Sequence, residues 1–411
     1  MNKLNELIQT LCPDGVEYKK LGEIAAISRG GNFQKKDYVE AGIPCIHYGQ
    51  IYTRYGLFVD RTISYISEEK AQKQKMAVKN DIIMAVTSEN IDDVCKCIAW
   101  LGEEEVAVSG HTAIIHHTIN PKYLVYYLHS SMFHKQKTKL AHGTKVIEVT
   151  PDKLLDVVLP VPPMEIQSAI VCVLDEFSEY MANLMSELAA ERNARKKQYE
   201  YYREKMLTFD ESVLRLPLGT LFDVRNGYTP SKANSDFWEG GTIPWFRMED
   251  IRKNGRVLFD ALQHVTTAAV KRGKLFPVNS LIISTTATIG EHALLKTAGL
   301  TNQQITNCAI KNEYVDKIIP EFAFYYFFKL GEWCKEHINQ GGGLAIIGTE
   351  KIKQFEFPVP PIKEQERIVA ILEQLDALYN DLSNDISAEI EQRQQQYEHY
   401  LDTLLTFKQR S

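Results

Sequence analysis

Two long stretches of the chain share one spacing of apolar side chains. In residues 165–206 the apolar positions recur at alternating steps of four and three, at Ile170, Leu174, Phe177, Met181, Leu184 and Leu188. Residues 363–405 repeat the spacing at Ile368, Leu372, Leu375, Tyr379, Leu382 and Ile386. Steps that average 3.5 residues keep one apolar stripe toward a partner helix, as in a coiled-coil seam. We therefore predict two long helices that pair in antiparallel fashion. An amphipathic helix packed on its own domain is the alternative.

The second half of the chain repeats the first in other places as well. LPVPPMEIQ at 159–167 returns as FPVPPIKEQ at 357–365, and GIPCIHYGQI at 42–51 returns as TIPWFRMEDI at 242–251. Because the order of the matches is unchanged and their displacement nearly constant, duplication is the economical explanation. We predict domains over 1–160 and 211–358. Each is followed by a proline hinge and a long helix, over 161–210 and 359–411.

Short apolar runs inside each large segment predict strands, namely DIIMAV (81–86), VAVSGHTAII (106–115), SLIIST (280–285) and TNCAIK (306–311). PKYLVYYLHSS and PEFAFYYFFKL carry aromatic and aliphatic residues at helical spacing and predict short helices. The expected unit is therefore an α+β domain that occurs twice.

Bulk composition narrows the class of protein. The 411 residues exceed one usual domain, and no apolar stretch approaches the ~18 residues of a membrane span, so we expect a cytoplasmic protein. The seven cysteines contain only one close pair, C-x-C, and are expected to be reduced core thiols. The net charge is −6, but 161–210 and 359–411 carry −3 and −5, whereas 1–160 is neutral and 211–358 carries +2. A surface that faces nucleic acid would lie on the two large segments.

Several motifs together resemble the specificity subunit of type I restriction-modification enzymes, over essentially the whole chain. They are LCPDGVEYKKLGEIA, GYTPSK, AHGTKVIEVTPDKL, QGGGLAIIGTEKIK and VPPIKEQERIV. The most specific is the pair of P-x-P-P-(x)3-Q elements, each before a long helix; Met164 to Gln167 departs slightly from the second copy. The resemblance implies an α+β fold of two similar target-recognition domains. Two long antiparallel coiled-coil helices would separate them, with an internal pseudo-twofold repeat.

The resemblance also implies a function and partners. Each domain would read one half of a bipartite, asymmetric site in double-stranded DNA. Two modification subunits would methylate adenine with S-adenosylmethionine, and restriction/translocase subunits would use ATP and Mg. This chain itself would hold no cofactor, no metal and no catalytic group, since it lacks an Asn-Pro-Pro-Tyr motif and a phosphate-binding loop. A coiled-coil scaffold that does not read DNA, or the target-recognition subunit of a related restriction system, remain alternatives.

Base reading requires forked donors and acceptors on exposed loops. Candidates in the first domain are Arg29, Asn32, Gln34, Lys35, Lys36, His47, Arg54 and Lys145. Candidates in the second are Asn226, Tyr228, Thr229, Ser231, Lys232, Arg247 and the Gly341 to Gly343 turn. Lys271, Arg272 and Lys274 are expected to touch phosphate. Asn302, Gln303 and Gln304 either read adenine or satisfy backbone groups at a strand end. For any single position, a solvated loop residue is the alternative.

Overall fold

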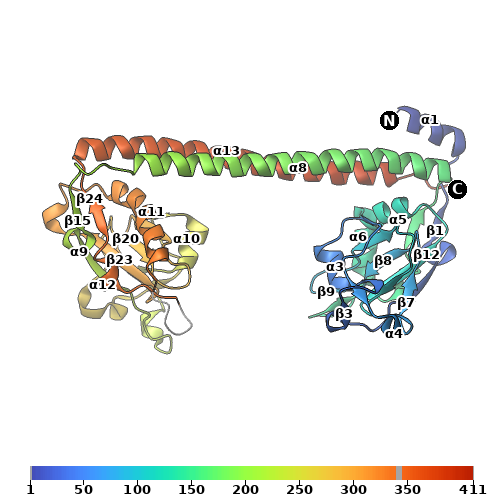
Figure 1. Cartoon of the computed structure of the whole chain (residues 1–411), viewed down its shortest axis with the longest axis horizontal. Coiled ribbons are helices and arrows are strands. Elements are labelled where there is room, and N and C mark those ends of the chain that lie inside the picture. The colour runs from blue at the N-terminus through green and yellow to red at the C-terminus, as the bar shows by residue number, and fades with distance from the viewer. Residues whose placement is uncertain (1, 339–344, 411) are drawn as a thin grey trace. The chain divides into compact units, whose positions relative to one another are not determined.

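The computed structural model describes residues 2–338 and 345–410 (Figure 1). It divides into two compact units, one of Met1–Ala189 with Ile386–Ser411 and one of Ala190–Asp385. Each unit therefore combines one domain with parts of both long helices, α8 (Met164–Met206) and α13 (Ile362–Leu405).

The first unit is built on two five-stranded sheets. One has the order β2 (Ala25–Arg29), β12 (Thr112–His117), β8 (Ile82–Ala85), β10 (Cys97–Trp100), β5 (Phe58–Val59). The other has the order β3 (Tyr38–Val39), β6 (Tyr65–Ile66), β4 (Ile43–Ile46), β11 (Val106–Val108), β7 (Lys75–Ala77). Short two-stranded pairs are β1 (Tyr18–Lys20) with β14 (Val158–Pro160), and β9 (Thr87–Ser88) with β13 (Ile147–Glu148). The helices are α1 (Asn2–Leu11), α2 (Leu21–Ile24), α3 (Tyr48–Thr53), α4 (Glu68–Ala71), α5 (Pro121–Leu128), α6 (Ser131–Leu140) and α7 (Pro151–Leu154).

The second unit repeats one of these five-stranded sheets and has a smaller second sheet. Its five-stranded sheet has the order β16 (Phe222–Asn226), β23 (Ile305–Ile310), β20 (Leu281–Ser284), β21 (His292–Leu295), β18 (Val257–Leu258). A three-stranded sheet follows the order β19 (His264–Val265), β17 (Ile243–Phe246), β22 (Leu300–Thr301), and β15 (Arg215–Pro217) pairs with β24 (Glu356–Pro358). The helices are α9 (Leu218–Leu221), α10 (Met248–Asn254), α11 (Pro320–Glu336) and α12 (Thr349–Ile352). In this five-stranded sheet and in the equivalent sheet β2-β12-β8-β10-β5, the second strand is antiparallel to its neighbours and the last strand pair is parallel. The predicted duplication of an α+β fold is confirmed.

The predicted strands are present, with one correction. VAVSGHTAII is not one strand, because its middle forms a turn between β11 and β12 in which the Thr112 amide donates to the Ser109 carbonyl at 3.2 Å. Gly110 lies in this turn so close to the Gly31 carbonyl that a Cβ would approach it to 2.5 Å. The two helical segments, by contrast, form α5 and α11 as predicted.

The long helices pack in two ways. Their first turns belong to the domain cores, where Ile170 and Leu174 of α8 are fully buried in the first unit and Ile368 and Leu372 of α13 in the second. Further along, the helices pair with each other inside each unit. Phe177 stacks on Tyr397 in the first unit, with 5.7 Å between the ring centroids. Tyr199 stacks on Tyr379 in the second unit, with 5.2 Å between the ring centroids. Packing on the domain and pairing of helices thus both occur, on successive parts of one stripe.

Two expectations about burial are wrong. Leu382 is 42% exposed rather than buried in the seam, and it lines a surface hollow together with the polar Arg195 and Gln198. Cys172 is exposed rather than a core thiol, since it lies on the solvent side of α8; all seven cysteines are free. None of the described helices is long and apolar enough to cross a membrane.

The glutamine of each proline motif joins the hinge to its domain. The side chain of Gln167 accepts from the Asn120 amide at 2.9 Å and donates to the Pro162 carbonyl at 2.8 Å. Gln365 makes the equivalent bonds with the Ile319 amide and the Pro360 carbonyl, at 2.9 and 2.8 Å. Both side chains are buried, so their amides satisfy backbone groups that water cannot reach. The motif therefore fixes how each helix leaves its domain.

Candidate nucleic-acid interface

Three segments that are distant in sequence meet on the first domain. The loop after β2, the start of α3 and the turn between β11 and β12 line a hollow of about 590 Å³. Its wall consists of Gly31, Asn32, Phe33, Gln34, Lys35, His47, Tyr48, Ser109, Gly110 and His111. The amide of Gly31 donates to the Val108 carbonyl at 2.6 Å, and the amide of Ser109 donates to the Ile46 carbonyl at 3.1 Å. These backbone bonds hold the three segments together.

Rings form one wall of this hollow. His47 lies 4.4 Å from Tyr48 and 6.4 Å from Phe33, and Tyr48 lies 5.0 Å from His111, all between ring centroids. Burial, followed by the charges of Lys35 and His111, holds the pKa of His47 below its ordinary value. The ring is therefore neutral near pH 7. Its Nδ1 accepts from the Gly49 amide at 3.2 Å, which places the proton on Nε2 as a donor.

The second domain has the same framework with other side chains. The amide of Tyr228 donates to the Thr301 carbonyl at 2.8 Å, and the amide of Asn302 donates to the Phe246 carbonyl at 3.1 Å. Arg247 precedes α10 as His47 precedes α3. The segment 302–304 consequently takes the place of 109–111. At equivalent positions the two domains present different hydrogen-bonding groups.

The structure brings together some of the predicted residues of the first domain and not others. Asn32, Gln34, Lys35 and His47 line the hollow, whereas Lys36, Arg54 and Lys145 do not. Arg29 is hydrogen-bonded within its own domain. Its guanidinium donates to the Glu148 carboxylate at 2.7 Å and to the Gly110 carbonyl at 3.1 Å. It braces the turn that carries His111.

Several predicted residues of the second domain also have partners within the protein. The Tyr228 hydroxyl donates to the Ala269 carbonyl at 2.9 Å, and Asn226 accepts from the Thr306 hydroxyl at 2.6 Å. Thr229 is hydrogen-bonded to the side chain of Gln303. Arg247 pairs with Glu249 at 3.1 Å. These contacts leave only part of each group for a ligand.

The remaining predicted residues are more open. Gln303 and Gln304 are exposed, while Asn302 is buried and accepts from the Gln304 amide at 3.1 Å, as a residue that satisfies a strand end does. Lys271, Arg272 and Lys274 are exposed on one short loop. Lys232 lines a separate small hollow, and the Ser231 carbonyl accepts from Trp238 Nε1 at 3.0 Å. The Gly341 to Gly343 turn lies outside the described residues.

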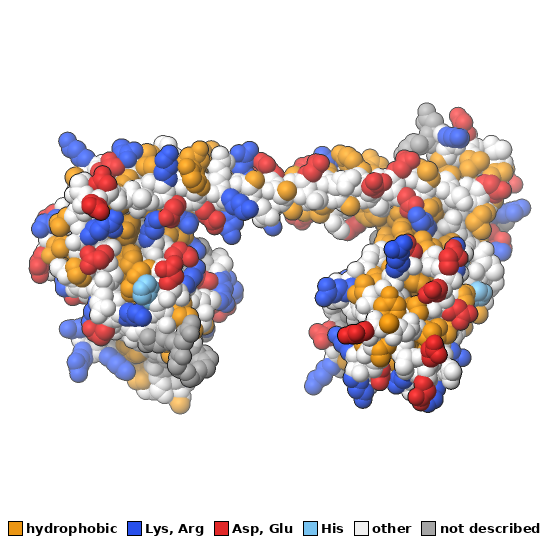
Figure 2. Space-filling model, in the orientation of Figure 1, with side chains coloured by type: hydrophobic (Ala, Val, Ile, Leu, Met, Phe, Trp, Pro, Cys, Tyr) orange, Lys and Arg blue, Asp and Glu red, His pale blue; other side chains and the backbone are white. Residues whose placement is uncertain are grey.

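Tyr48, Ser109 and His111 were missed from the sequence, because nothing local marks them. Aligning the two turns, 109–111 on 302–304, would have indicated them. Charge offers little help, since Figure 2 shows Lys and Arg mixed with Asp and Glu over the visible face of each unit. Within the described residues, no group of three or more His, Cys, Asp or Glu side chains could hold a metal ion.

Comparison with known proteins gives consistent matches. The family model described as "Type I restriction modification DNA specificity domain" matches residues 13–191 and 215–392. The EcoprrI specificity subunit of Escherichia coli is 46% identical over 215 residues, which are 51% of this chain and 53% of that protein, so the match spans about half of that relative. The EcoR124I/EcoR124II specificity subunit of the same organism is 36% identical over 302 residues, 70% of each chain.

Solved structures agree in fold. A chain from a structure on complex assembly and conformational transition of the type I R-M system has a TM-score of 0.78 at 17% identity, covering 95% of this chain and 97% of that one. The HsdS subunit from Thermoanaerobacter tengcongensis has a TM-score of 0.53 at 18% identity, covering 96% and 97%.

Proposed function

Because this chain belongs to the type I restriction-modification DNA specificity family, we propose that it is the sequence-reading subunit of such an enzyme. Each domain would read one half of a bipartite, asymmetric site in double-stranded DNA. The observation that carries the proposal is the framework of three segments that both domains share, held by equivalent backbone hydrogen bonds, which lines a hollow in the first domain. One framework with different side chains at equivalent positions suits two readers of different sequences.

The side chains in these places suit base edges in the major groove. Arg247 carries a forked donor that matches guanine, and Gln303 and Gln304 carry the amide that matches adenine. His47 presents Nε2 as a donor to a base acceptor such as guanine O6 or N7. Lys271, Arg272 and Lys274 would contact phosphates, which position a protein without reading sequence.

The partners follow from the same family. Two modification subunits would take S-adenosylmethionine and methylate adenine, and restriction/translocase subunits would take ATP and Mg. This chain would recognise the DNA sequence and would contribute no catalytic group. The number of unread base pairs between the half-sites would depend on the helical connection through α8.

The test is sequencing of methylated adenines in a host that expresses the chain with its modification subunits and has no other methyltransferase. We expect the unaltered chain to give one bipartite motif. His47→Ala with His111→Ala should relax only one half of it, and Gln303→Ala with Gln304→Ala only the other. Lys353→Ala, at the half-buried C-cap of α12 and away from both sets of segments, is the control and should leave the motif unchanged.

Three results would contradict the proposal. A chain that gives no motif and no duplex binding in a gel-shift assay would be a scaffold. Variants that relax both halves equally would mean that the domains do not read separately. Genes for fused catalytic subunits beside this one would indicate a related restriction system.

A further inference from the structure

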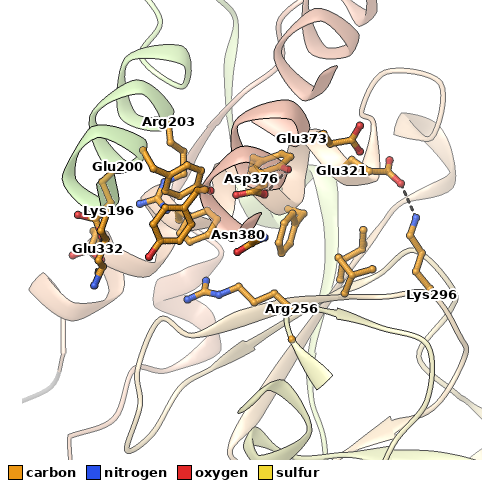
Figure 3. Close-up of a pocket in the computed structure, with 18 of the residues that line it drawn as sticks. Lys196, Glu200, Arg203, Arg256, Lys296, Glu321, Glu332, Glu373, Asp376 and Asn380 are labelled. Carbon is orange, nitrogen blue, oxygen red and sulfur yellow. Dashed lines mark hydrogen bonds and ion pairs between the residues drawn. The ribbon is translucent and has the colours of Figure 1, made fainter. Parts of the chain in front are cut away.

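The second unit contains a larger hollow than the one on the first domain. It measures about 970 Å³ and lies between the end of α8, the start of α13, helix α11 and strands β18 and β21 (Figure 3). Basic, acidic and aromatic side chains all face it, among them Arg203, Arg256, Phe324, Tyr325 and Asp376. None of these residues belongs to the DNA interface proposed above.

Two arginines in this hollow share one aromatic ring. The guanidinium carbons of Arg203 and Arg256 lie 3.8 and 4.7 Å from the ring centroid of Phe328. Other basic groups of the wall have acidic partners, such as Lys296 with Glu321 at 2.6 Å. Within the described part of the chain, no carboxylate lies at ion-pair distance from either arginine. Two like charges are therefore held side by side with no carboxylate in direct contact, and Glu291 and Asp376 act on Arg256 only from further away.

The repeat shows that the fold does not need these charges. Arg203 corresponds to Leu401, six residues before the shared final Phe of each matching segment. Arg256 corresponds to Leu57, since their carbonyls accept from the equivalent amides of Leu294 and Ala99 at 2.8 and 2.9 Å. Both leucines pack in the core of the first unit. The two positions that hold packed leucines in the first unit therefore hold arginines that line a hollow in the second unit.

The rest of the wall offers groups for a flat, polar ring. Phe324 and Tyr325 provide aromatic surface. Asp376 also lines the hollow, where it accepts from the Tyr325 hydroxyl at 2.7 Å and is hydrogen-bonded to Tyr199 (Figure 3). Asn380 adds an amide. Guanidinium pairs match phosphoryl oxygens, aromatic rings stack on nucleobases, and a carboxylate or amide can accept from an exocyclic amino group. Ligand pockets usually measure about 300–1,000 Å³, which this hollow fits.

We propose that this hollow binds a nucleotide, with its phosphoryl group on Arg203 and Arg256 and its base against the aromatic wall toward Asp376 and Asn380. The site is independent of sequence reading. Desolvation at the wall, together with the charge of Arg203, lowers the pKa of Arg256, although more than a third of that residue stays accessible. A bound phosphoryl dianion would relieve the repulsion between the two guanidinium groups.

The test is calorimetric titration of the full-length chain with AMP, adenosine and inorganic phosphate. We expect one saturable site for AMP, bound more tightly than either part alone. Arg203→Leu with Arg256→Leu restores the residues of the first unit and should therefore fold, while weakening AMP binding by roughly tenfold or more. Arg256→Gln alone should weaken it in the same direction. Arg252→Leu, an exposed arginine on α10 outside the hollow, is the matched control.

Other results would overturn the proposal. They are the absence of saturable AMP binding, AMP no tighter than phosphate, or AMP affinity that the leucine variant retains. A leucine variant that loses affinity for duplex DNA, with a smaller salt dependence than the unaltered chain, would make the arginines contacts for the DNA backbone instead.

Discussion

Leu174→Ala tests whether the first turns of the long helices are part of a domain core. Leu174 is fully buried and belongs to one cluster with Leu401 and Leu405 of α13. Deleting its three outer carbons loses about 2 kcal/mol of transfer free energy. The cavity that remains raises the total loss to roughly 2–5 kcal/mol, because several segments hold the surrounding wall in place.

Urea unfolding measures the loss in the free energy of unfolding. Hydrogen exchange with mass spectrometry on the folded chain shows which segments lose protection. Protection should fall in strands of the first unit, such as β8 and β12, before it falls elsewhere. Leu382→Ala is the control, since this leucine occupies the same stripe but is 42% exposed, and it should cost less than about 1 kcal/mol. Equal losses for the two variants, or a loss below 1 kcal/mol for Leu174→Ala, would refute the reasoning.

Three further predictions concern pH, backbone space and salt. Burial, with the nearby charge of Arg256, lowers the pKa of His292 to about 3, so stability is complete above pH 6.5 and declines as pH falls, because only the unfolded chain takes up the proton. At pH 5 thermal melts should show a loss of about 2 kcal/mol that His292→Leu lacks, and identical pH profiles would contradict this. Gly227→Ala places a Cβ 2.3 Å from the Thr301 carbonyl and should lower the melting temperature, unlike Gly56→Ala, which meets nothing within 4 Å; equal melting temperatures would disprove the crowding. Lys271→Ala should weaken duplex binding alike for all sequences and reduce the salt slope by about 1, whereas a change in the recognised motif would make it a base contact.

The frame of the fold could be predicted from the sequence because it depends on periodic patterns. The steps of four and three that end at Leu188 and Ile386 fix both helices, and the proline motifs mark where they begin. The pattern could not show where domain packing gives way to helix pairing. Ile170 and Phe177 lie on the same apolar stripe of α8, and only their neighbours in the fold differ. Ile170 packs in the domain core, whereas Phe177 stacks on Tyr397 of α13.

The candidate site was harder to predict because it depends on contacts between distant residues. Loop composition indicated Asn32 and Lys35, but it could not show that Arg29 is bound to Glu148, 119 positions away, or that His111 faces the same hollow as His47. Spacing along the chain does not report which donors are already used inside the protein. Those assignments require the backbone path.

The core of the first unit has a consequence for the order of folding during synthesis. Leu401 and Leu405 complete that core, and the Arg410 amide donates to the Val16 carbonyl at 2.9 Å. The amino-terminal domain therefore has to wait until residues 386–410 have left the ribosome, while residues 190–385 already contain everything their own unit needs. Although domains commonly fold in the order of translation, the later half of this polypeptide would finish first. Until then, the nascent first half would expose apolar surface to chaperones.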